Sequence, residues 1–500
     1  MEAALLHRFA RARFRASPCL CSAKTLSRSL PHLALLQSRL ISSSPSSTPS
    51  NSPAHHTTLS AITSAISATT KQRPLIALGI ETSCDDTCAA IVTSERQILS
   101  EVLRTQHHLH EPMGGIVPKL AHHAHMRNLP EVVKEAIQKA GLGERGIQEI
   151  DVIAVTRGPG LAHCLGVGLN AAKTLAAALN KPLIGVHHME AHALTARLTT
   201  KDPDSPGKLL GADPYPSFPF LTLLVSGGHT LLLVAHSVDR YTTLATTVDD
   251  SVGEAFDKTA RELDIPWLPG RAGGPGASLE EFAKGSQTPL RYLDQLPIPM
   301  SLRTNKRKMK FSFAGLKSAV TRIVNQEKAS DPGGVMDEKK KRDLAAGFQH
   351  CALTHLCQKV EQGLVDCREQ GVQISSLVIS GGVGRNMILR AMMDEVCQRF
   401  EYELSNPLKH SAVLTTSAGP GLGPSAVGME AVTSSGVTET ARARRPVQVI
   451  CPPPKLCTDN AVMIAWTGLE RYQRGLVDCY DIDIAPKWPL DMLGTGVVPE

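Results

Sequence analysis

The chain has 500 residues, with 53 lysine and arginine side chains against 47 aspartate and glutamate side chains, which gives a net charge of +6. Residues 1–70 contain seven of these basic side chains and one acid, so the rest of the chain carries no net charge. This balance excludes a nucleic-acid-binding protein that is basic over its whole surface. No run of roughly twenty apolar residues is present, so we expect no contact with a membrane. The length is ample for two domains.

The first segment, residues 1–72, is rich in arginine and serine, from "HRFARARFRA" to "ISSSPSSTPSNSP". This composition is typical of a mitochondrial or plastid transit peptide. The apolar run "LPHLALLQSRL" is short and interrupted by His and Arg, which disfavours a secretory signal. We therefore expect a transit peptide and disordered leader, and a location in the mitochondrial matrix. The alternative, a tail without a targeting role, is less favoured because such a tail should also contain acids.

Two β-hairpins are predicted by apolar runs on either side of a polar turn. In the first, the runs Leu75–Ile80 and Cys88–Val92 bracket the turn Glu81–Thr87. In the second, "PFLTLLVSGGHTLLLVAH", the turn is Ser226–Thr230. Each hairpin is followed later by a strand, a glycine-rich turn and a helix, in "DVIAVTRGPGLAHCLGVGLNAAKTLAAAL" and in "SLVISGGVGRNMILRAMMDEV".

This repetition predicts an α/β protein with two related lobes and a ligand cleft between them. Glycine-rich turns at strand ends expose backbone N–H groups toward phosphate, although each turn alone could serve packing only. We expect a first lobe at residues 73–187, a second lobe at 188–473, and a C-terminal segment, 474–500, that returns to the first lobe. Residues 201–218 resemble a linker-like insertion. Residues 411–445 lack helix or strand periodicity and favour a disordered insertion.

The stretch "VHHMEAHAL" places His188 and His192 four residues apart, so on a helix both rings leave the same face. That is a metal-ligand spacing. It is not the zinc-protease motif HExxH, because Glu190 lies two positions after His188. His187 would point about 100° away from His188, which favours a structural role. Of the twelve cysteines none forms a CxxC pair, so we expect buried free thiols in a reducing compartment.

Several long motifs occur in one order along the chain: "GIETSCDDT", "HHMEAH", "VSGGHT" with "VGEAFDKTA", "FSFAGLKSAV", and "ISGGVGRN" with "CTDNAVMIAW". Together they resemble the tRNA N6-threonylcarbamoyladenosine transferase family, formerly called O-sialoglycoprotein endopeptidase or glycoprotease. With its leader, the chain is similar to the mitochondrial members. The resemblance covers Leu75 to roughly Leu493 apart from the two insertions. It implies the actin-like ATPase fold, shared with sugar kinases and heat-shock chaperones.

The resemblance implies that His188, His192 and Asp459 hold one divalent metal ion. Iron and zinc both suit two imidazoles and a carboxylate. It also implies transfer of a threonylcarbamoyl group from L-threonylcarbamoyl adenylate to N6 of adenosine 37, in tRNAs that read codons beginning with A. N6 is a poor nucleophile. The enzyme must therefore hold an activated carbonyl and stabilise its growing charge, which a cation and converging N–H groups do without a covalent nucleophile such as Ser226 or Cys84.

The remaining site residues are also carried over from the family's motifs. Asp85 is the expected catalytic residue, through metal-water or phosphate contacts, whereas Asp86 stands where many members have Glu and a direct role for it is in doubt. The expected substrate-binding residues are Val225, Ser226, Gly227, Gly228, His229, Asp257, Gly276, Glu280, Asn386 and Thr458. Gly274 is an alternative to Gly276 in this set. Asp257 and Glu280 could instead be charged residues on the solvated face of a helix.

The segment Arg303–Lys310, "RTNKRKMK", is a local basic cluster that can contact tRNA phosphates, or can be a solvated loop. The expected partners are mitochondrial tRNA, a separate synthase that makes the donor, and a second copy of the chain. Three other functions stay open. A metalloprotease would cleave glycoproteins, an ATPase or sugar kinase of the same fold would turn over ATP without tRNA, and a nucleotide-binding scaffold would tolerate loss of His188 or Asp459.

Overall fold

The computed structural model describes residues 73–113, 115–201, 214–266, 274–299, 309–405 and 446–495, with side chains of 402–405 not described. The predicted leader at 1–72, the predicted insertion at 411–445 and most of the one at 201–218 lie outside these residues. Most of the basic segment, residues 303–308, lies outside them as well.

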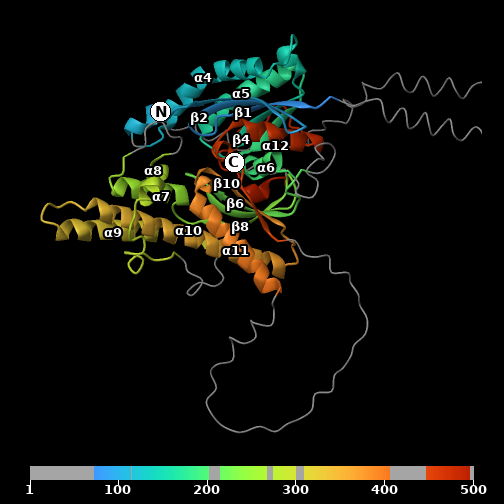
Figure 1. Ribbon diagram of the computed structural model, residues 1–500. Helices are drawn as coiled ribbons and strands as arrows, with labels where there is room; N and C mark the ends of the chain where they lie inside the picture. Colours follow the sequence, from blue (N-terminus) through green and yellow to red (C-terminus); the bar gives the residue numbers. More distant parts are fainter. Residues whose placement is uncertain are drawn as a thin grey trace, which may run out of the picture. The chain divides into compact units, whose positions relative to one another are not determined.

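Within the described residues the strands form two sheets that share one topology (Figure 1). In the first sheet the strand order is β3 (Ile98–Thr105), β2 (Asp86–Thr93), β1 (Ile76–Glu81), β4 (Val152–Gly158), β5 (Leu183–His187). In the second sheet it is β9 (Lys310–Phe311), β8 (Tyr241–Thr247), β7 (Thr230–Ala235), β6 (Phe220–Val225), β10 (Ser376–Ser380), β11 (Gln448–Ile450).

Apart from the short β9, both sheets run in the order third, second, first, fourth and fifth strand of their lobe. In both, the first three strands are antiparallel and the last two are parallel to the first. This repetition confirms the two related α/β lobes expected of the actin-like ATPase fold. It also confirms both hairpins, but both turns are shorter than predicted. Because Asp86 pairs with Thr105 of β3, the second strand begins there and the first turn comprises residues 82–85. The second turn comprises residues 226–229, since β7 begins at Thr230.

The helices cover the faces of both sheets. Their bounds are α3 (His107–His110), α4 (Pro118–Lys139), α5 (Ala162–Leu179), α6 (His188–Thr199), α7 (Val252–Glu262), α8 (Pro275–Ala283), α9 (Ala314–Ser330), α10 (Glu338–Glu369), α11 (Met387–Ser405) and α12 (Ala461–Gln473). Short 3-10 turns are η1 (Glu111–Met113), η2 (Gly146–Glu149), η3 (Gly382–Arg385), η5 (Pro454–Leu456) and η6 (Leu490–Met492). Among these described helices, none combines the length and apolar character that a bilayer crossing requires.

Alternating strand residues separate the core into layers, because successive side chains of a strand point to opposite faces. Leu78 and Ile80 of β1 pack under α4 and α5, whereas Ala77 faces α6 and α12. Leu224 of β6 joins the same cluster as Ala77 from the other sheet, while Leu223 faces α7 to α11. Helices α6 and α12 therefore lie between the two sheets (Figure 1).

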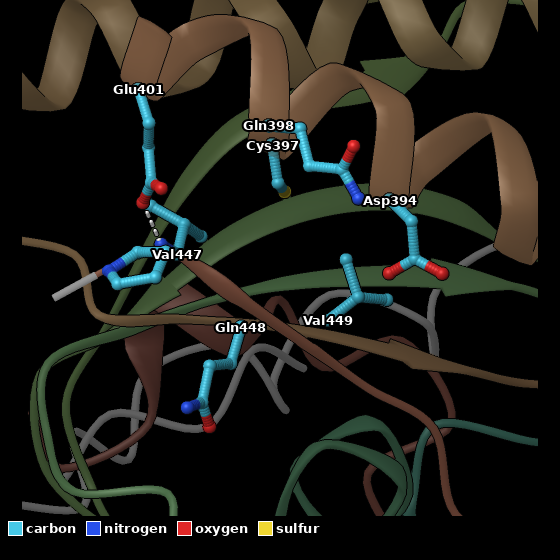
Figure 2. Close-up of a pocket in the computed structure, with 8 residues that line it drawn as sticks. Asp394, Cys397, Gln398, Glu401, Val447, Gln448 and Val449 are labelled. Carbon is cyan, nitrogen blue, oxygen red and sulfur yellow. Dashed lines mark hydrogen bonds between the residues drawn. The ribbon is translucent and has the colours of Figure 1, made fainter. Parts of the chain in front are cut away.

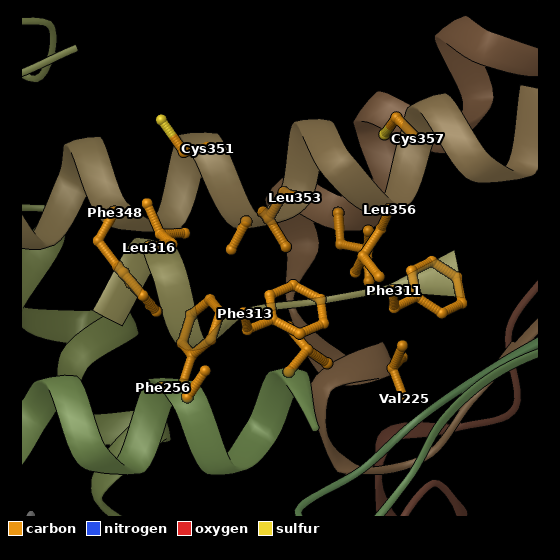
Figure 3. Packing of buried hydrophobic residues seen from close by; sticks show 14 of the residues in the cluster. Val225, Phe256, Phe311, Phe313, Leu316, Phe348, Cys351, Leu353, Leu356 and Cys357 are labelled. Atoms are coloured by element: carbon orange, nitrogen blue, oxygen red, sulfur yellow. The ribbon is translucent and has the colours of Figure 1, made fainter. Parts of the chain in front are cut away.

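The "FSFAGLK" motif packs the second lobe. Phe311 and Phe313 are fully buried against α10, in the cluster that contains Phe256 and Phe348 (Figure 3). Asp249 accepts hydrogen bonds from the backbone N–H groups of Phe313 (2.7 Å) and Ala314 (3.4 Å), so an aspartate from another segment caps α9. The motif is thus explained by packing and capping.

Helix α12 approaches β1 and β4 very closely at two glycines. A Cβ on Gly79 would lie 2.3 Å from the carbonyl oxygen of Ala461, and one on Gly468 would lie 2.4 Å from the Cβ of Ala154. Only glycine permits this spacing without a shift of the backbone. The contact brings Asp459, two residues before α12, to the carboxyl end of β1.

The C-terminal residues contact both sheets. The N–H of Asp478 donates to the carbonyl of Leu183 in β5 (3.0 Å), and that of Ala485 to Arg157 in β4 (2.9 Å). Farther on, Leu490 and Leu493 join the cluster between the sheets. The predicted domain boundaries stay a prediction. Helix α12, which they assign to the second lobe, contacts β1, β2 and β4 of the first sheet.

Candidate functional site

Helix α6 is fixed at its first residue by His187. The Nδ1 atom of His187 accepts from the N–H of Met189 (3.1 Å), and Glu190 accepts from the N–H of His187 (3.4 Å), which is a reciprocal capping arrangement. The Nε2 of His187 lies 2.8 Å from the carbonyl of Trp488, and burial lowers the pKa of the ring to about 3. His187 is therefore neutral and engaged in starting the helix.

The structure brings together the three predicted metal ligands. The rings of His188 and His192 lie 4.8 Å apart on one face of α6. Their Nε2 atoms lie 3.3 and 3.2 Å from Oδ1 of Asp459. Both histidines are buried, at 5% and 2% exposure, while 28% of the Asp459 side chain is exposed. Ligand atoms of the three residues fall within 4.8 Å of one another, so this donor set fits one small cation.

The electrostatics of this group favour positive charge. Burial opposes protonation of His188, but the carboxylates of Asp459 and Glu81 raise its pKa to about 10. Burial likewise opposes ionisation of Asp459, yet the neighbouring His188 holds the pKa of that carboxyl well below its usual range. The buried Glu81 and the partly exposed Asp459 therefore face one histidine, and a bound cation would satisfy these two acids in place of a proton.

Glu81 was missed by the sequence analysis, although it stands in the quoted motif "GIETS". It is fully buried at the end of β1 and lies with Oε2 3.0 Å from Nδ1 of His188. Its carboxylate also accepts from the hydroxyl of Thr156 and the N–H of Ser83. One signal in the sequence could have identified Glu81: it is an acid at the end of an otherwise apolar strand. A buried carboxylate requires partners, so such an acid indicates a polar site.

The first turn, residues 82–85, carries the predicted catalytic residue Asp85. The carboxylates of Asp85 and Asp86 and the ring of His107 form a second group whose ligand atoms lie within 4.8 Å. Burial, and then the charge of Asp85, raise the pKa of Asp86 to about 8. Burial also raises the pKa of the Cys84 thiol, which agrees with the expectation that Cys84 is not a nucleophile.

The second turn, residues 226–229, presents backbone groups. The N–H of Ser226 donates to the carbonyl of His229 (2.8 Å), and the N–H of His229 donates to Oγ of Ser226 (3.1 Å). Gly227 and Gly228 are exposed, and a Cβ on either would meet no atom within 4 Å. In the described part of the chain, no hydrogen bond from their N–H groups is present. Val225 is the buried last residue of β6.

This second turn lies beside the metal-ligand group and is held by α7. Burial, followed by the charges of His188 and His192, lowers the pKa of His229 to about 4. The hydroxyl of Ser251, the N-cap residue of α7, donates to the carbonyl of Gly227. A Cβ on Gly253 would lie 2.5 Å from the carbonyl of Ser226, so the helix needs glycine there to approach the turn.

The other predicted substrate-binding residues lie around α7, α8 and α11. Oδ1 of Asp257 accepts from the N–H of Gly276 (2.7 Å), and burial raises the pKa of Asp257. Gly274 is the N-cap residue of α8. Glu280 is half-buried near Arg385, and burial raises its pKa as well. The hydrogen bond joins Asp257 to Gly276, and these contacts do not select a ligand.

Asn386 and Thr458 both serve helix starts. Asn386 is 2% exposed, and its Oδ1 accepts from the N–H groups of Ile388 and Leu389, 3.0 Å each, at the start of α11. Its Nδ2 donates to Gln349 (3.0 Å). The carbonyl of Thr458 accepts from Nδ2 of Asn460 (2.8 Å), the N-cap residue of α12. Contacts of these two residues with a nucleotide stay a prediction.

A separate pocket lies between α11 and β11 (Figure 2). It has a volume of about 410 Å³, and none of its lining residues belongs to the predicted site. It is lined by Asp394, Cys397, Gln398, Glu401, Pro446, Val447, Gln448 and Val449. The pocket thus lies where the chain enters and leaves residues 406–445.

Comparisons with known proteins agree with the motifs. The model of the TsaD family, described as tRNA N6-adenosine threonylcarbamoyltransferase, matches residues 97–411. A protein of Arabidopsis thaliana named probable tRNA N6-adenosine threonylcarbamoyltransferase, mitochondrial, is 36% identical over 431 residues, which cover 83% of this chain and 75% of that protein. The mitochondrial enzyme of that name from Xenopus tropicalis is 35% identical, covering 82% and 86%. The protein named tRNA N6-adenosine threonylcarbamoyltransferase from the bacterium Zymomonas mobilis is 35% identical, covering 83% of this chain and 92% of that protein.

Proposed function

Because the chain belongs to the tRNA N6-adenosine threonylcarbamoyltransferase family, we propose that it forms N6-threonylcarbamoyladenosine at position 37 of mitochondrial tRNAs that read codons beginning with A. The donor is L-threonylcarbamoyl adenylate and the second product is AMP. The observation that carries this proposal is the convergence of His188, His192 and Asp459 beside the glycine turn at residues 226–229.

The three ligands would hold one divalent ion, iron or zinc. When bound, that ion would supply positive charge against the oxygens of the acyl phosphate. The side chains of this site are buried on the α6 side and open at Asp459, so access is from the Asp459 side. A water-poor site of this kind strengthens each electrostatic contact with the substrate.

The reaction is a substitution at the carbamoyl carbon. A bond forms from N6 of the adenosine to this carbon, the bond from the carbon to the phosphate oxygen breaks, and AMP leaves with the electron pair. N6 loses one proton, which passes to solvent water. We assign Asp85 to this site as the catalytic residue, a carboxylate that acts through contacts with water or phosphate. In such a mechanism the enzyme does not activate the nucleophile N6; it positions N6 against a donor that is already reactive.

The glycine turn is the expected place for the phosphate and acyl end of the donor. The N–H groups of Gly227 and Gly228 are available, and open space lies beside both residues. Val225, Ser226 and His229 complete this turn. Asp257, Gly276 and Glu280 are assigned to the ribose and adenine, with contacts from Asn386 and Thr458. Backbone N–H groups are suitable donors for phosphate because they need no counter-charge on a side chain.

The cellular context follows from the same resemblance. We assign the protein to the mitochondrial matrix, with its donor supplied by a separate synthase and with a homodimer as the assembly. Residues 303–310 are assigned to tRNA phosphates. Of these, Lys310 lies in β9, which pairs with β8 at Thr246. Phosphate contacts of this kind predict that tRNA affinity falls with salt.

The direct test uses purified protein, an unmodified tRNA transcript and synthetic L-threonylcarbamoyl adenylate. Mass spectrometry of the digested nucleosides should detect N6-threonylcarbamoyladenosine, and prior treatment with a chelator should abolish it. A transcript with guanosine at position 37 is the matched control. Absence of the product with metal-loaded protein would contradict the proposal. Metal-dependent cleavage of a glycoprotein would then favour the protease, and ATP turnover without tRNA would favour the kinase.

A further inference from the structure

Glu81 is a fully buried carboxylate with three donors around it. Its Oε1 accepts from the N–H of Ser83, and its Oε2 accepts from the hydroxyl of Thr156 and faces Nδ1 of His188 at 3.0 Å. Thr156 is itself fully buried, in β4, next to β1. The carboxylate is therefore fixed from its own turn and from the neighbouring strand, and its free direction points at His188.

This contact determines which nitrogen of His188 carries the proton. An ionised carboxylate has no proton to donate, so the hydrogen between the two groups belongs to Nδ1 of His188. In the neutral ring, Nε2 is then unprotonated and directed at Asp459, 3.3 Å away. The hydroxyl of Ser83, 3.3 Å from the same Nδ1, is compatible with this arrangement because its oxygen can accept.

The second histidine is not oriented in this way. Within the described residues, Nδ1 of His192 is buried and has no hydrogen-bond partner. Its ring is positioned by its Nε2 contact with Asp459 at 3.2 Å and by the T-shaped contact with His188. The two ligands from one helix are therefore unequal: one is held from behind by a carboxylate and the other is not.

We propose that Glu81 is the positioning residue of the metal centre, and that it fixes the tautomer and the ring orientation of His188 from behind. Thr156 and Ser83 hold Glu81 in place. The proposal rests on the proposed function only in taking His188 as a metal ligand. A carboxylate behind a ligating histidine strengthens the ligand, and its loss typically weakens metal binding by about 10–100-fold.

The test measures Co²⁺ binding to the metal-free full-length protein by competition with a chelator, without tRNA or donor. Glu81→Gln keeps the shape but places an NH₂ group against either the N–H of Ser83 or the donors Thr156 and His188. We expect its Co²⁺ affinity to fall by about 10–100-fold. We also expect a changed visible absorption spectrum of the bound Co²⁺ and, in ¹⁵N spectra of the imidazoles, loss of the Nδ1–H signature of His188.

Two further variants keep the proposal falsifiable. Thr156→Val removes one donor to Glu81 with little change of volume, so it should weaken Co²⁺ binding less than Glu81→Gln and leave the protein folded. Glu470→Gln is the matched control, because Glu470 is a buried glutamate that joins α12 to Arg197 of α6 at 2.9 Å. It should lower stability without changing Co²⁺ affinity or the spectrum.

The outcomes separate this inference from the proposed function. If folded Glu81→Gln, or Thr156→Val where the former does not fold, binds Co²⁺ with the affinity and the spectrum of the wild type, the inference is wrong. An equal loss in Glu470→Gln would also overturn it, because the effect would then be general destabilisation. If the wild type binds Co²⁺ but makes no modified nucleoside, the proposed function fails while the role of Glu81 is still decided by these measurements.

Discussion

The first turn, residues 82–85, and the second turn, residues 226–229, connect the first two strands of equivalent sheets but differ in chemistry. The first is flanked by Glu81 and Asp86 and contains Asp85, so it presents carboxylates toward histidines of α6 and α3. The second has two exposed glycines and presents backbone groups. The repeated scaffold thus gathers carboxylates at one turn, where we propose a cation, and exposes backbone groups at the other, where we propose an anion.

The way each turn is held also differs. The first turn is held by His125 of α4, which contacts the carbonyl of Cys84 (3.0 Å) and the hydroxyl of Thr87 in β2 (2.8 Å), and by Leu161, whose N–H donates to the carbonyl of Ser83 (2.8 Å). The second is held by the start of α7, through the contacts of Ser251 with Gly227 and of Gly253 with Ser226. The comparison teaches that the repeated topology places a turn at the same point of each sheet, while the residues of the turn determine its chemistry.

The largest expected effect is on the cation side. Asp459→Ala removes the carboxylate shared by His188 and His192, and we expect kcat/KM for tRNA modification to fall on the order of 10³-fold, about 4 kcal/mol. The measurement is the rate of N6-threonylcarbamoyladenosine formation. Asp481→Ala, at an exposed carboxylate, is the control. Full activity of folded Asp459→Ala would contradict a catalytic role of this metal-ligand group.

A smaller effect is expected on the anion side. The double change Gly227→Ala and Gly228→Ala places methyl groups in open space, so the fold should lose less than about 1 kcal/mol. If donor phosphate occupies that space, KM for the adenylate should rise about tenfold, or about 1.4 kcal/mol. Gly166→Ala, at another glycine with free space, should leave KM unchanged. An unchanged KM in the double variant would remove the second turn from donor binding.

A pH dependence of stability is expected at the first turn, because Asp86 flanks it. The folded pKa of Asp86, about 8, lies above its usual value near 3.8. The folded state therefore binds the extra proton between these values, and the contribution of Asp86 to stability is present below pH 3.8 and lost as pH rises through 8. The denaturation midpoint of metal-free wild type should fall over this window more than that of Asp86→Asn. Parallel pH profiles for the two proteins would contradict the assignment.

The smallest expected effect concerns how the second turn is held. Ser251→Ala removes the N-cap of α7 and the hydrogen bond to Gly227, which should cost about 1 kcal/mol of unfolding free energy. Asp337→Ala removes the N-cap of α10, an exposed site away from both turns, at a similar cost. We expect only the first of these variants to raise KM for the adenylate, measured beside chemical denaturation. An equal KM in the Ser251→Ala and Asp337→Ala variants would show that α7 does not position the second turn.

Local patterns in the sequence predicted much of this arrangement. The hairpins and the strand–glycine–helix units are visible as apolar runs around glycines, and the spacing of His188 and His192 places both on one helix face. These features depend on residues close in the chain, whose geometry is set by strand and helix periods.

Contacts between distant segments could not be predicted in the same way. The partnership of Glu81 with His188 joins residues 107 positions apart, and nothing local to "GIETS" specifies it. The close approach of α12 at Gly79 depends likewise on a helix almost 400 residues later. Only the shared resemblance linked Asp459 to the two histidines, since neither period nor spacing relates segments that meet through tertiary packing.

The contact of His192 with Asp459 spans 267 positions. An N-terminal fragment that ends before Asp459, whether an interrupted translation product or a proteolytic piece, therefore cannot assemble all three candidate ligands. A growing polypeptide lacks this group until α12 has emerged and packed against Gly79 and Ala154. If these residues hold the proposed ion, its uptake is restricted to chains that are almost complete.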